Sequence, residues 1–440
     1  MASKRERNGA YQITVSLGYD KNGKKKLKTA TWTPDPAKTK KQNEDELSYF
    51  IADFERKAKS GKSLDAEKLT FADLVDIWRE DHGKTQLEAT SLERIDIILQ
   101  KALPALGDVL LSEMRPKHIK DFLKGLQKEG YVKGAERREY AESTLQRYKG
   151  GVSAILGYAV DEEIMTENPC TRAKLPKVAV DPDEDPDDTP CFTADEAKAF
   201  LAYLNSDYTV THRGRPRKDG LPSAEKTYTR KVNTKTKLFF VMALKTGLRR
   251  GELLGLRWQD IDTKKGTITV KLSAAHTKDL GQHNKGPKNR PSRRTVPLAA
   301  SVVPLLKEYK HEQAEYRKSL GTKWQGSKTA GDLWQAKQHL FTQWNGKQMH
   351  INTASHTFAK IIARYNKTTD GEPLPLIPLH GLRHSTASLL IAEGVDPVTV
   401  AAILGHADTR TTLSIYSHFF KENAEKAINA LDNALEEKQA

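Results

Sequence analysis

The stretch from Gly405 to Phe419 holds two residue types that can do chemistry, an imidazole at His406 and a phenol at Tyr416. A tyrosine hydroxyl is a poor nucleophile because its free pKa is near ~10. It can attack a phosphate when neighbouring cations and hydrogen-bond donors stabilise the charge that develops. A single tyrosine at a helical position more often packs in a core, so the hypothesis depends on cations supplied by other segments.

One such segment is the run TGLRRGELL, which follows the apolar residues 238–245. Arg249 and Glu252 are three positions apart and share a helix face, so the acid can orient the guanidinium. An arginine placed just after a buried helix suits bidentate binding of a phosphate. The alternative is a purely structural Arg–Glu pair. The neighbouring Arg250 leaves open which arginine would bind.

Two further segments can supply a proton or a positive charge. Lys288 lies between the strand-like runs 267–270 and 294–298, in a long segment expected to be mobile. A lysine on a turn there can protonate a leaving oxygen, although Lys285 lies close by. His380 and Arg383 are one turn apart at an expected helix start, where the positive end of the helix dipole also favours anions.

Composition bounds the class of protein. The chain has 440 residues, which predicts two to four domains, and a formal charge of +15, which favours a polyanionic partner such as nucleic acid. Its two cysteines, Cys170 and Cys191, form no disulfide framework and no zinc-ligand spacing. No apolar signal or membrane-spanning stretch is present. These features predict a protein of a reducing compartment.

The N-terminal region predicts a β-hairpin over residues 10–32, because Asn22-Gly23 separates two alternating runs. Such a ribbon can enter a DNA groove, or it can be an ordinary solvated edge hairpin. Residues 18–25 nearly spell a phosphate-binding loop but lack its closing Ser or Thr, so nucleotide binding is rejected. The candidate DNA-binding residues are the lysines that crowd the turn and second strand: Lys21, Lys24, Lys25, Lys26 and Lys28.

Helical periodicity and capping signals divide the rest of the chain. A charged helix is expected over 43–59, followed by a four-helix bundle. The expected helix starts of the bundle are Thr70, Ser91, Arg115-Pro116 and Ser143. The acidic, proline-rich stretch 173–192 predicts a linker.

Beyond this linker, Thr193 is expected to cap a helix over 197–204, and residues 209–237 to form an exposed basic loop. Residues 318–337 are typical of an insertion and carry Trp324 and Trp334. Gly247 should end a buried helix, Ala387 to Ala392 should be helical, and Asp396-Pro397 should open a helix ending at Gly405.

In order and spacing, several of these motifs resemble the tyrosine recombinase family of the phage-integrase type, over roughly residues 193–420. The motifs are TGLRRGELLGLRW, the hairpin lysine, HGLRH, LGH and TTLSIYSH. The region before them is similar, more loosely, to integrases of temperate phages and conjugative transposons.

The resemblance implies a mainly α fold with small β-sheets, an α+β class. It implies a three-stranded arm-type DNA-binding domain with a helix at 1–62 and a helical core-binding domain at 66–172. After the linker at 173–192 it implies a mostly helical catalytic domain at 193–440. A C-terminal helical tail at 421–440 would dock on a neighbouring subunit or on its own domain.

The resemblance also implies residue roles. Tyr416 would attack the scissile phosphate, forming a 3′-phosphotyrosyl link and releasing a 5′-hydroxyl. Arg249, Arg383 and His406 would hold the non-bridging oxygens. His380 would assist proton transfer, and Lys288 would protonate the leaving oxygen. No cofactor or metal is implied.

The implied partners are double-stranded DNA attachment sites and three further copies of the chain, in a homotetramer on paired sites. An excision factor or a host DNA-bending protein can take part, no membrane is involved, and the expected compartment is the cytoplasm of a bacterial host. Two alternatives stay open at this point: a type IB topoisomerase-like nicking-closing enzyme, and a DNA-binding regulator without catalysis.

Overall fold

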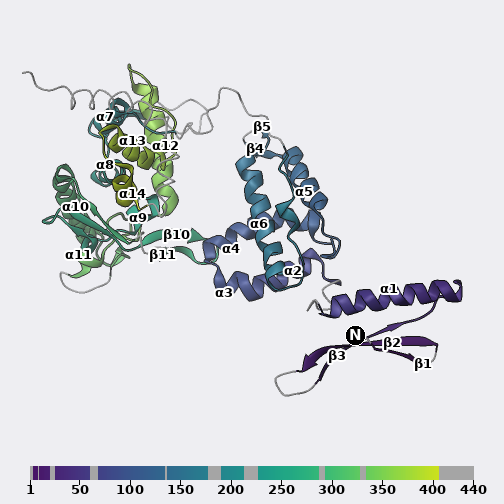
Figure 1. Cartoon of the computed structure of the whole chain (residues 1–440). Coiled ribbons are helices and arrows are strands. Elements are labelled where there is room, and N and C mark those ends of the chain that lie inside the picture. Colours follow the sequence, from purple (N-terminus) through teal and green to yellow (C-terminus); the bar gives the residue numbers. More distant parts are fainter. Residues whose placement is uncertain are drawn as a thin grey trace, which may run out of the picture. The chain divides into compact units, whose positions relative to one another are not determined.

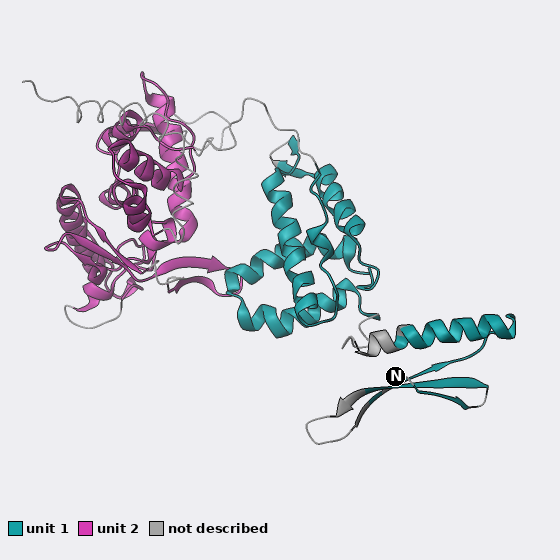
Figure 2. Cartoon of the chain, viewed as in Figure 1, with its two compact units in different colours: residues 1–180 teal, residues 181–440 magenta. Residues whose placement is uncertain are grey.

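The computed structural model describes residues 3–7, 9–19, 25–59, 68–133, 136–176, 190–212, 226–286, 293–327 and 333–405. The chain divides into two compact units, residues 1–180 and 181–440, shown in different colours in Figure 2. The elements are labelled in Figure 1. Helices predominate and the sheets are small, which confirms the expected fold class.

Unit 1 begins with a three-stranded antiparallel sheet in the order β1-β2-β3, followed by a helix. The elements are β1 Ser3–Arg7, β2 Ala10–Tyr19, β3 Lys25–Trp32 and α1 Lys40–Lys59. The predicted hairpin is confirmed by the β2–β3 pairing, although its turn lies outside the described residues. Ile13 and Val15 of β2 pack with Leu47 and Phe54 of α1 in a small core, so the helix covers one face of the sheet.

The rest of unit 1 is a helical bundle with its own core. Its main helices are α2 Phe71–Trp78, α4 Ala89–Leu106, α5 Pro116–Glu129 and α6 Glu142–Asp161. Shorter elements are a π-helix Arg79–Gly83, α3 Lys84–Gln86, β4 Tyr131–Lys133, β5 Glu136–Arg138 and a 3-10 turn Pro169–Thr171.

Two of the four predicted helix starts in the bundle are confirmed and two are displaced, depending on which residue takes the cap position. The capping box of Thr70 and Asp73 opens α2, and Pro116 occupies the first turn of α5, as predicted. The predicted start at Ser91 is wrong by two residues, because Glu88 takes the extended cap position of α4. The cap predicted at Ser143 is two residues late, because Ala141 takes that position for α6.

Unit 2 is built around one large apolar core that joins most of its helices to a three-stranded antiparallel sheet. Its helices are α7 Ala194–Tyr203, α8 Thr234–Thr246, α9 Arg250–Gly255, α10 Val303–Leu320, α11 Leu333–Lys337, α12 Ile351–Thr368, α13 Gly381–Ala392 and α14 Pro397–Leu404. Its strands are β6 Asp207–His212, β7 Lys226–Lys231, β8 Ile261–Asp262, β9 Thr267–Val270, β10 Ser273–Thr277, β11 Gly281–Lys285 and β12 Arg294–Pro297.

Two expected loops of unit 2 were wrong. Residues 207–212 and 226–231 pair as the antiparallel hairpin β6–β7 instead of forming a basic loop, because their Thr, Tyr and Val side chains favour strands. Much of the segment between β9 and β12 is a second hairpin, β10–β11, and not a long mobile loop. β12 and β8 flank β9 in a separate three-stranded sheet.

The tryptophans of the expected insertion pack against each other. Trp324 is buried, and its ring meets that of Trp334 edge to face at a centroid distance of 6.3 Å. The guanidinium carbon of Arg317 lies 3.9 Å from the centroid of the Trp334 ring. The segment is therefore anchored on α10 by an aromatic pair and a cation–π contact.

Three helix ends bring separate segments together in unit 2. α8 ends at Gly247 in the left-handed conformation, α13 begins next to His380, and α14 ends at Gly405, also left-handed. The predicted glycine stops and the Asp396 cap are confirmed. A Cβ at position 247 would lie 2.4 Å from Cδ2 of Leu404, so the two glycine-ended helices approach closely there.

We predict that Gly247→Ala destabilises unit 2 by more than Gly281→Ala. Both glycines have positive φ, 61° and 60°, so each substitution carries the ~1–2 kcal/mol cost of a left-handed alanine. Only position 247 is crowded, since nothing lies within 4 Å of a Cβ at 281. Overpacking should add ~1–3 kcal/mol to the loss in free energy of unfolding, measured by urea denaturation. Equal losses would contradict the close approach of the helices.

Candidate active site

Arg249 occupies the cap position of the short helix α9, directly after the turn that ends α8. Its backbone N–H donates to Oε2 of Glu252 at 2.9 Å, and its Nη1 donates to Oε1 of the same carboxylate at 3.0 Å. Its side chain is 39% exposed, whereas that of Glu252 is 5% exposed. The predicted Arg–Glu pair is thus present, with the acid in the interior and the guanidinium reaching solvent.

Glu252 binds a second arginine that the sequence reading did not select. Arg294, the first residue of β12, donates from Nη1 to Oε1 at 3.1 Å and from Nη2 to Oε2 at 2.9 Å. Burial alone would raise the pKa of Glu252, but the hydrogen bonds and charges of Arg294 and Arg249 outweigh it and hold that pKa below its usual value. The carboxylate is therefore ionised and shared between two guanidinium groups.

Backbone carbonyls at the end of α14 fix both arginines. Nη2 of Arg249 donates to the carbonyl oxygen of Gly405 at 3.0 Å, and Nε of Arg294 donates to that of Ile403 at 2.9 Å. The last carbonyls of a helix lack intrahelical partners and carry partial negative charge, so they suit cationic donors. In the sequence the next residue is His406.

Arg383 reaches the same turn from α13. Its side chain is buried, and Nη1 donates to the carbonyl oxygen of Gly247 at 2.8 Å. One turn further along α13, Oγ1 of Thr386 donates to the carbonyl oxygen of Leu244 at 2.8 Å. The start of α13 is therefore fastened to the end of α8, two residues before Arg249.

His380 lies at the cap of α13 and is accessible to solvent. Its pKa is lowered by partial loss of hydration first, and then by the positive charges of Arg383, Arg249 and Arg250, against a smaller opposing effect of Glu252. Arg383 lies one turn after His380 on α13, and its hydrogen bond to Gly247 brings the segment that carries Arg249 and Arg250 next to this turn. The imidazole is neutral at pH 7.

His384 lies about one helical turn after His380 on α13. Its ring lies edge to face with that of His380 at a centroid distance of 4.9 Å. Burial, followed by the charges of His380 and Arg383, lowers the pKa of His384 to about 4. A neutral, partly buried imidazole in this place supports the ring of His380 by packing against it.

Arg250, the other arginine that could have bound the phosphate, makes a different contact. Its Nη1 donates to Oγ of Ser355 on α12 at 2.8 Å. Burial lowers its pKa. The carboxylate contact belongs to Arg249, which makes Arg249 the arginine whose orientation is fixed within the site.

The structure brings together three of the predicted site residues, Arg249, His380 and Arg383. Two guanidinium groups and a neutral imidazole around one turn can bind a phosphate and assist a proton transfer. The other three, Lys288, His406 and Tyr416, lie outside the described residues. Their roles stay predictions.

The candidate DNA-binding lysines are only partly covered by the structure. The backbones of Lys25, Lys26 and Lys28 lie in β3. Lys21 and Lys24 lie outside the described residues. Within the described ranges, no group of three or more His, Cys, Asp or Glu side chains could hold a metal ion. No helix in that part of the chain is long and apolar enough to span a membrane.

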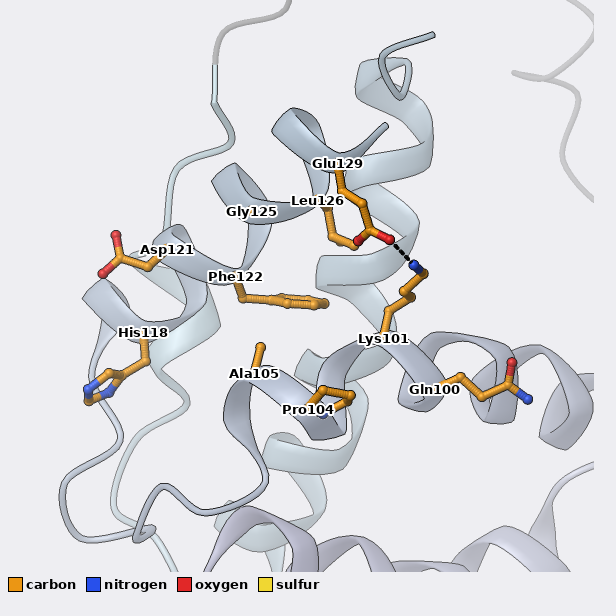
Figure 3. A pocket seen from close by; sticks show the side chains of 10 residues that line it. All are labelled: Gln100, Lys101, Pro104, Ala105, His118, Asp121, Phe122, Gly125, Leu126 and Glu129. Carbon is orange, nitrogen blue, oxygen red and sulfur yellow. Dashed lines mark hydrogen bonds and ion pairs between the residues drawn. The ribbon is translucent and has the colours of Figure 1, made fainter. Parts of the chain in front are cut away.

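A pocket of about 610 Å³ lies in unit 1 between α4 and α5 (Figure 3). Its apolar floor places Phe122 of α5 opposite Pro104 of α4, and Lys101 and Glu129 form an ion pair at its rim. Nδ1 of His118 accepts a hydrogen bond from the backbone N–H of Arg115, so this ring is occupied in capping α5. The pocket therefore offers an apolar hollow and no convergent reactive groups.

Comparison with known proteins shows which family the chain resembles. Residues 221–423 match the family described as "Phage integrase family", and residues 70–127 match "Phage integrase, N-terminal SAM-like domain". A relative named "Tyrosine recombinase XerC-like", from Caldanaerobacter subterraneus subsp. tengcongensis, is 24% identical over 96% of this chain and 96% of its own length. The ICEBs1 integrase of Bacillus subtilis is 24% identical over 99% of this chain and 100% of its own.

Among solved structures, the Tn1549 transposon integrase in complex with transposon right end DNA matches with a TM-score of 0.61 and 20% identity. The match covers 83% of this chain and 100% of that one, and it supports the fold. The chain belongs to the phage integrase family, the tyrosine-type site-specific DNA recombinases.

We predict that Glu252→Gln flattens the acid limb of the stability curve. Because the pKa of Glu252 is lowered on folding, its contribution is complete above about pH 4.5 and is lost as the pH falls through the folded value. At pH 7 the variant should lose ~3–5 kcal/mol, since it leaves a buried arginine without its charged partner. That difference should shrink by pH 3 when thermal unfolding is followed between pH 7 and pH 3.

The matched control is Glu315→Gln. Glu315 also pairs with a cation, Lys318 at 2.7 Å, but on an exposed surface where solvent screens the charges. Its curve should follow that of the wild type. Parallel wild-type and Glu252→Gln curves would show that folding does not lower the pKa of Glu252.

Proposed function

We propose that this chain integrates or excises a mobile DNA element, with Tyr416 as the nucleophile that links covalently to DNA. The observation that supports the proposal best is the gathering of Arg249, Arg383 and His380 from segments more than 130 residues apart. The matches to the ICEBs1 integrase and to the Tn1549 transposon integrase support the kind of DNA substrate.

The phosphate is the group that this cationic site suits. As Tyr416 attacks the phosphorus, negative charge grows on the two non-bridging oxygens, and Arg249 and Arg383 would neutralise it. Arg249 is held by Glu252 and by the carbonyl of Gly405. Its orientation therefore exists before substrate binds, and little reorganisation is needed during the reaction.

The bonds and protons balance within the chain and the DNA. The bond from the Tyr416 oxygen to phosphorus forms as the bond from phosphorus to the 5′-oxygen breaks, leaving a 3′-phosphotyrosyl link. His380, neutral at pH 7, would assist removal of the phenol proton, and Lys288 would give a proton to the departing 5′-oxygen. His406 would add a donor to a non-bridging oxygen. Reversal with a different 5′-hydroxyl rejoins the strand.

The wider assembly is part of the proposal. Three modules would contact DNA: the sheet with α1, the helical bundle and unit 2 after the linker at 173–192. Four copies would assemble on paired attachment sites in the cytoplasm of a bacterial host, with the tail 421–440 docking between copies. An excision factor or a DNA-bending host protein would set the direction of the reaction.

We predict that Tyr416→Phe abolishes covalent protein–DNA adducts on nicked suicide substrates carrying the element's ends. Only one hydroxyl is lost, so the dissociation constant for the same DNA should change little. Adducts are scored by denaturing gel electrophoresis, and binding by mobility shift. Phe substitution at another tyrosine, the exposed Tyr49, is the control and should leave adduct formation intact. Retained adducts in Tyr416→Phe would falsify the assignment of the nucleophile.

We predict that the hairpin lysines contribute phosphate contacts to arm-site DNA. Replacing Lys21, Lys24 and Lys25 with Gln should weaken binding and reduce the slope of log affinity against log salt by ~0.9 for each lost contact. The control replaces Lys40 and Lys41 at the exposed start of α1, which belongs to the same module. Equal slopes for wild type and the hairpin variant would mean that the hairpin is only a solvated surface.

A further inference from the structure

Arg294 is a buried cation whose hydrogen bonds join three separate segments. Its side chain is 8% exposed, it grips both oxygens of Glu252, and its Nε donates to the carbonyl oxygen of Ile403. Through Glu252 it is one contact away from Arg249. Because its side chain is buried and bonded to Glu252 and Ile403, Arg294 would act on substrate through these neighbours and not by direct contact.

We propose that Arg294 is a positioning residue for the recombination chemistry: it orients Arg249 through Glu252 and ties both to the end of α14. The inference rests on the proposed function, because it assigns a task in that reaction. The phosphate-binding arginine and the chain leading into His406 and Tyr416 share one anchor.

The geometry requires an arginine at this position. Glu252 receives two parallel bonds from Nη1 and Nη2 of Arg294, while Nε points to a carbonyl on a different element. Only a planar guanidinium presents such a rigid fork together with a third donor. A lysine ammonium keeps the charge beside Glu252 but cannot hold these three acceptors in fixed directions.

The close approach of Gly405 shows how tightly this anchor sits on the end of α14. A Cβ at position 405 would lie 2.7 Å from Nη1 and 2.8 Å from the guanidinium carbon of Arg294. Gly405 has a φ of 71° and its carbonyl oxygen accepts from Arg249. The residue that ends α14 is therefore in contact with one arginine and hydrogen-bonded to the other.

The test is Arg294→Lys in the full-length chain. We expect single-turnover cleavage of a suicide substrate to slow by about 10- to 100-fold, the usual size of losses when a group that orients a reactive side chain is changed. The dissociation constant for DNA should stay close to the wild-type value, because the side chain of Arg294 is only 8% exposed. The effect is thus on the chemical step.

A matched control separates positioning from a general loss of stability. Unit 2 contains a second buried carboxylate, Asp260, which is shared by Arg257 and Lys271 at 3.2 and 3.3 Å. As at Glu252, the arginine precedes the acid by three residues and donates its backbone N–H to it. Arg257→Lys makes the same substitution at a comparable ion pair that has no part in the charges acting on His380, so its cleavage rate should stay near that of the wild type.

A second substrate gives a readout that a merely structural role would not move. A methylphosphonate at the scissile position lacks the negative charge that Arg249 neutralises, so a displaced Arg249 matters less. Most of the difference between wild type and Arg294→Lys should disappear on this substrate. A less stable but correctly arranged variant would be slowed to the same degree on both substrates.

The outcomes separate the two hypotheses. If wild-type protein forms no adduct at Tyr416, the proposed function itself fails. If wild-type protein forms it, the positioning inference is overturned by any of three results: an Arg294→Lys rate equal to wild type, an equal loss on both substrates, or an equal loss in Arg257→Lys. A selective loss on the phosphodiester substrate, with binding unchanged, supports it.

Discussion

One ionised, buried carboxylate holds the functional part of unit 2 together. Glu252 would be costly to bury alone, because an isolated charge in the interior loses its hydration. Two arginines compensate for this, one beside it in sequence and one from β12, and both also bind carbonyls at the end of α14. Because the buried acid needs both arginines, α9, β12 and the end of α14 are held in fixed positions relative to one another. The same contact leaves Arg249, alone of the two arginines, exposed enough to receive a phosphate.

The helices supply the rest of the arrangement through their ends. α8 stops at Gly247, whose carbonyl accepts from Arg383, and α14 stops at Gly405, whose carbonyl accepts from Arg249. A carbonyl at the end of a helix has no backbone N–H within the helix to accept from, and here an arginine guanidinium donates to it instead. Partial burial, followed by the positive charges of Arg383, Arg249 and Arg250, lowers the pKa of His380, so its imidazole is neutral near pH 7. Binding of an anion and availability of a proton acceptor follow from one set of contacts.

Features with local causes were predictable from the sequence. The glycine stops at 247 and 405, the capping box at Thr70 and the cap at Asp396 depend on neighbouring residues only. Arg294 was missed because its partners lie 42 and 109 residues away, and nothing in its spacing points to Glu252. The β6–β7 hairpin was missed because charge and proline suggested a loop, whereas the alternating Thr and Tyr residues paired. The roles of Lys288, His406 and Tyr416 stay predictions.

The central claim is that Arg249, held by Glu252, and Arg383, held by the carbonyl of Gly247, lie beside His380 and form a site for a phosphate. The titration of the His380 ring, followed by NMR and assigned with a His380→Gln variant, tests it most directly. In free protein the pKa should lie below the ordinary value of 6.5, and it should rise when an inorganic phosphate anion binds and offsets the arginine charges. A pKa at or above 6.5 that does not respond to phosphate would contradict the account.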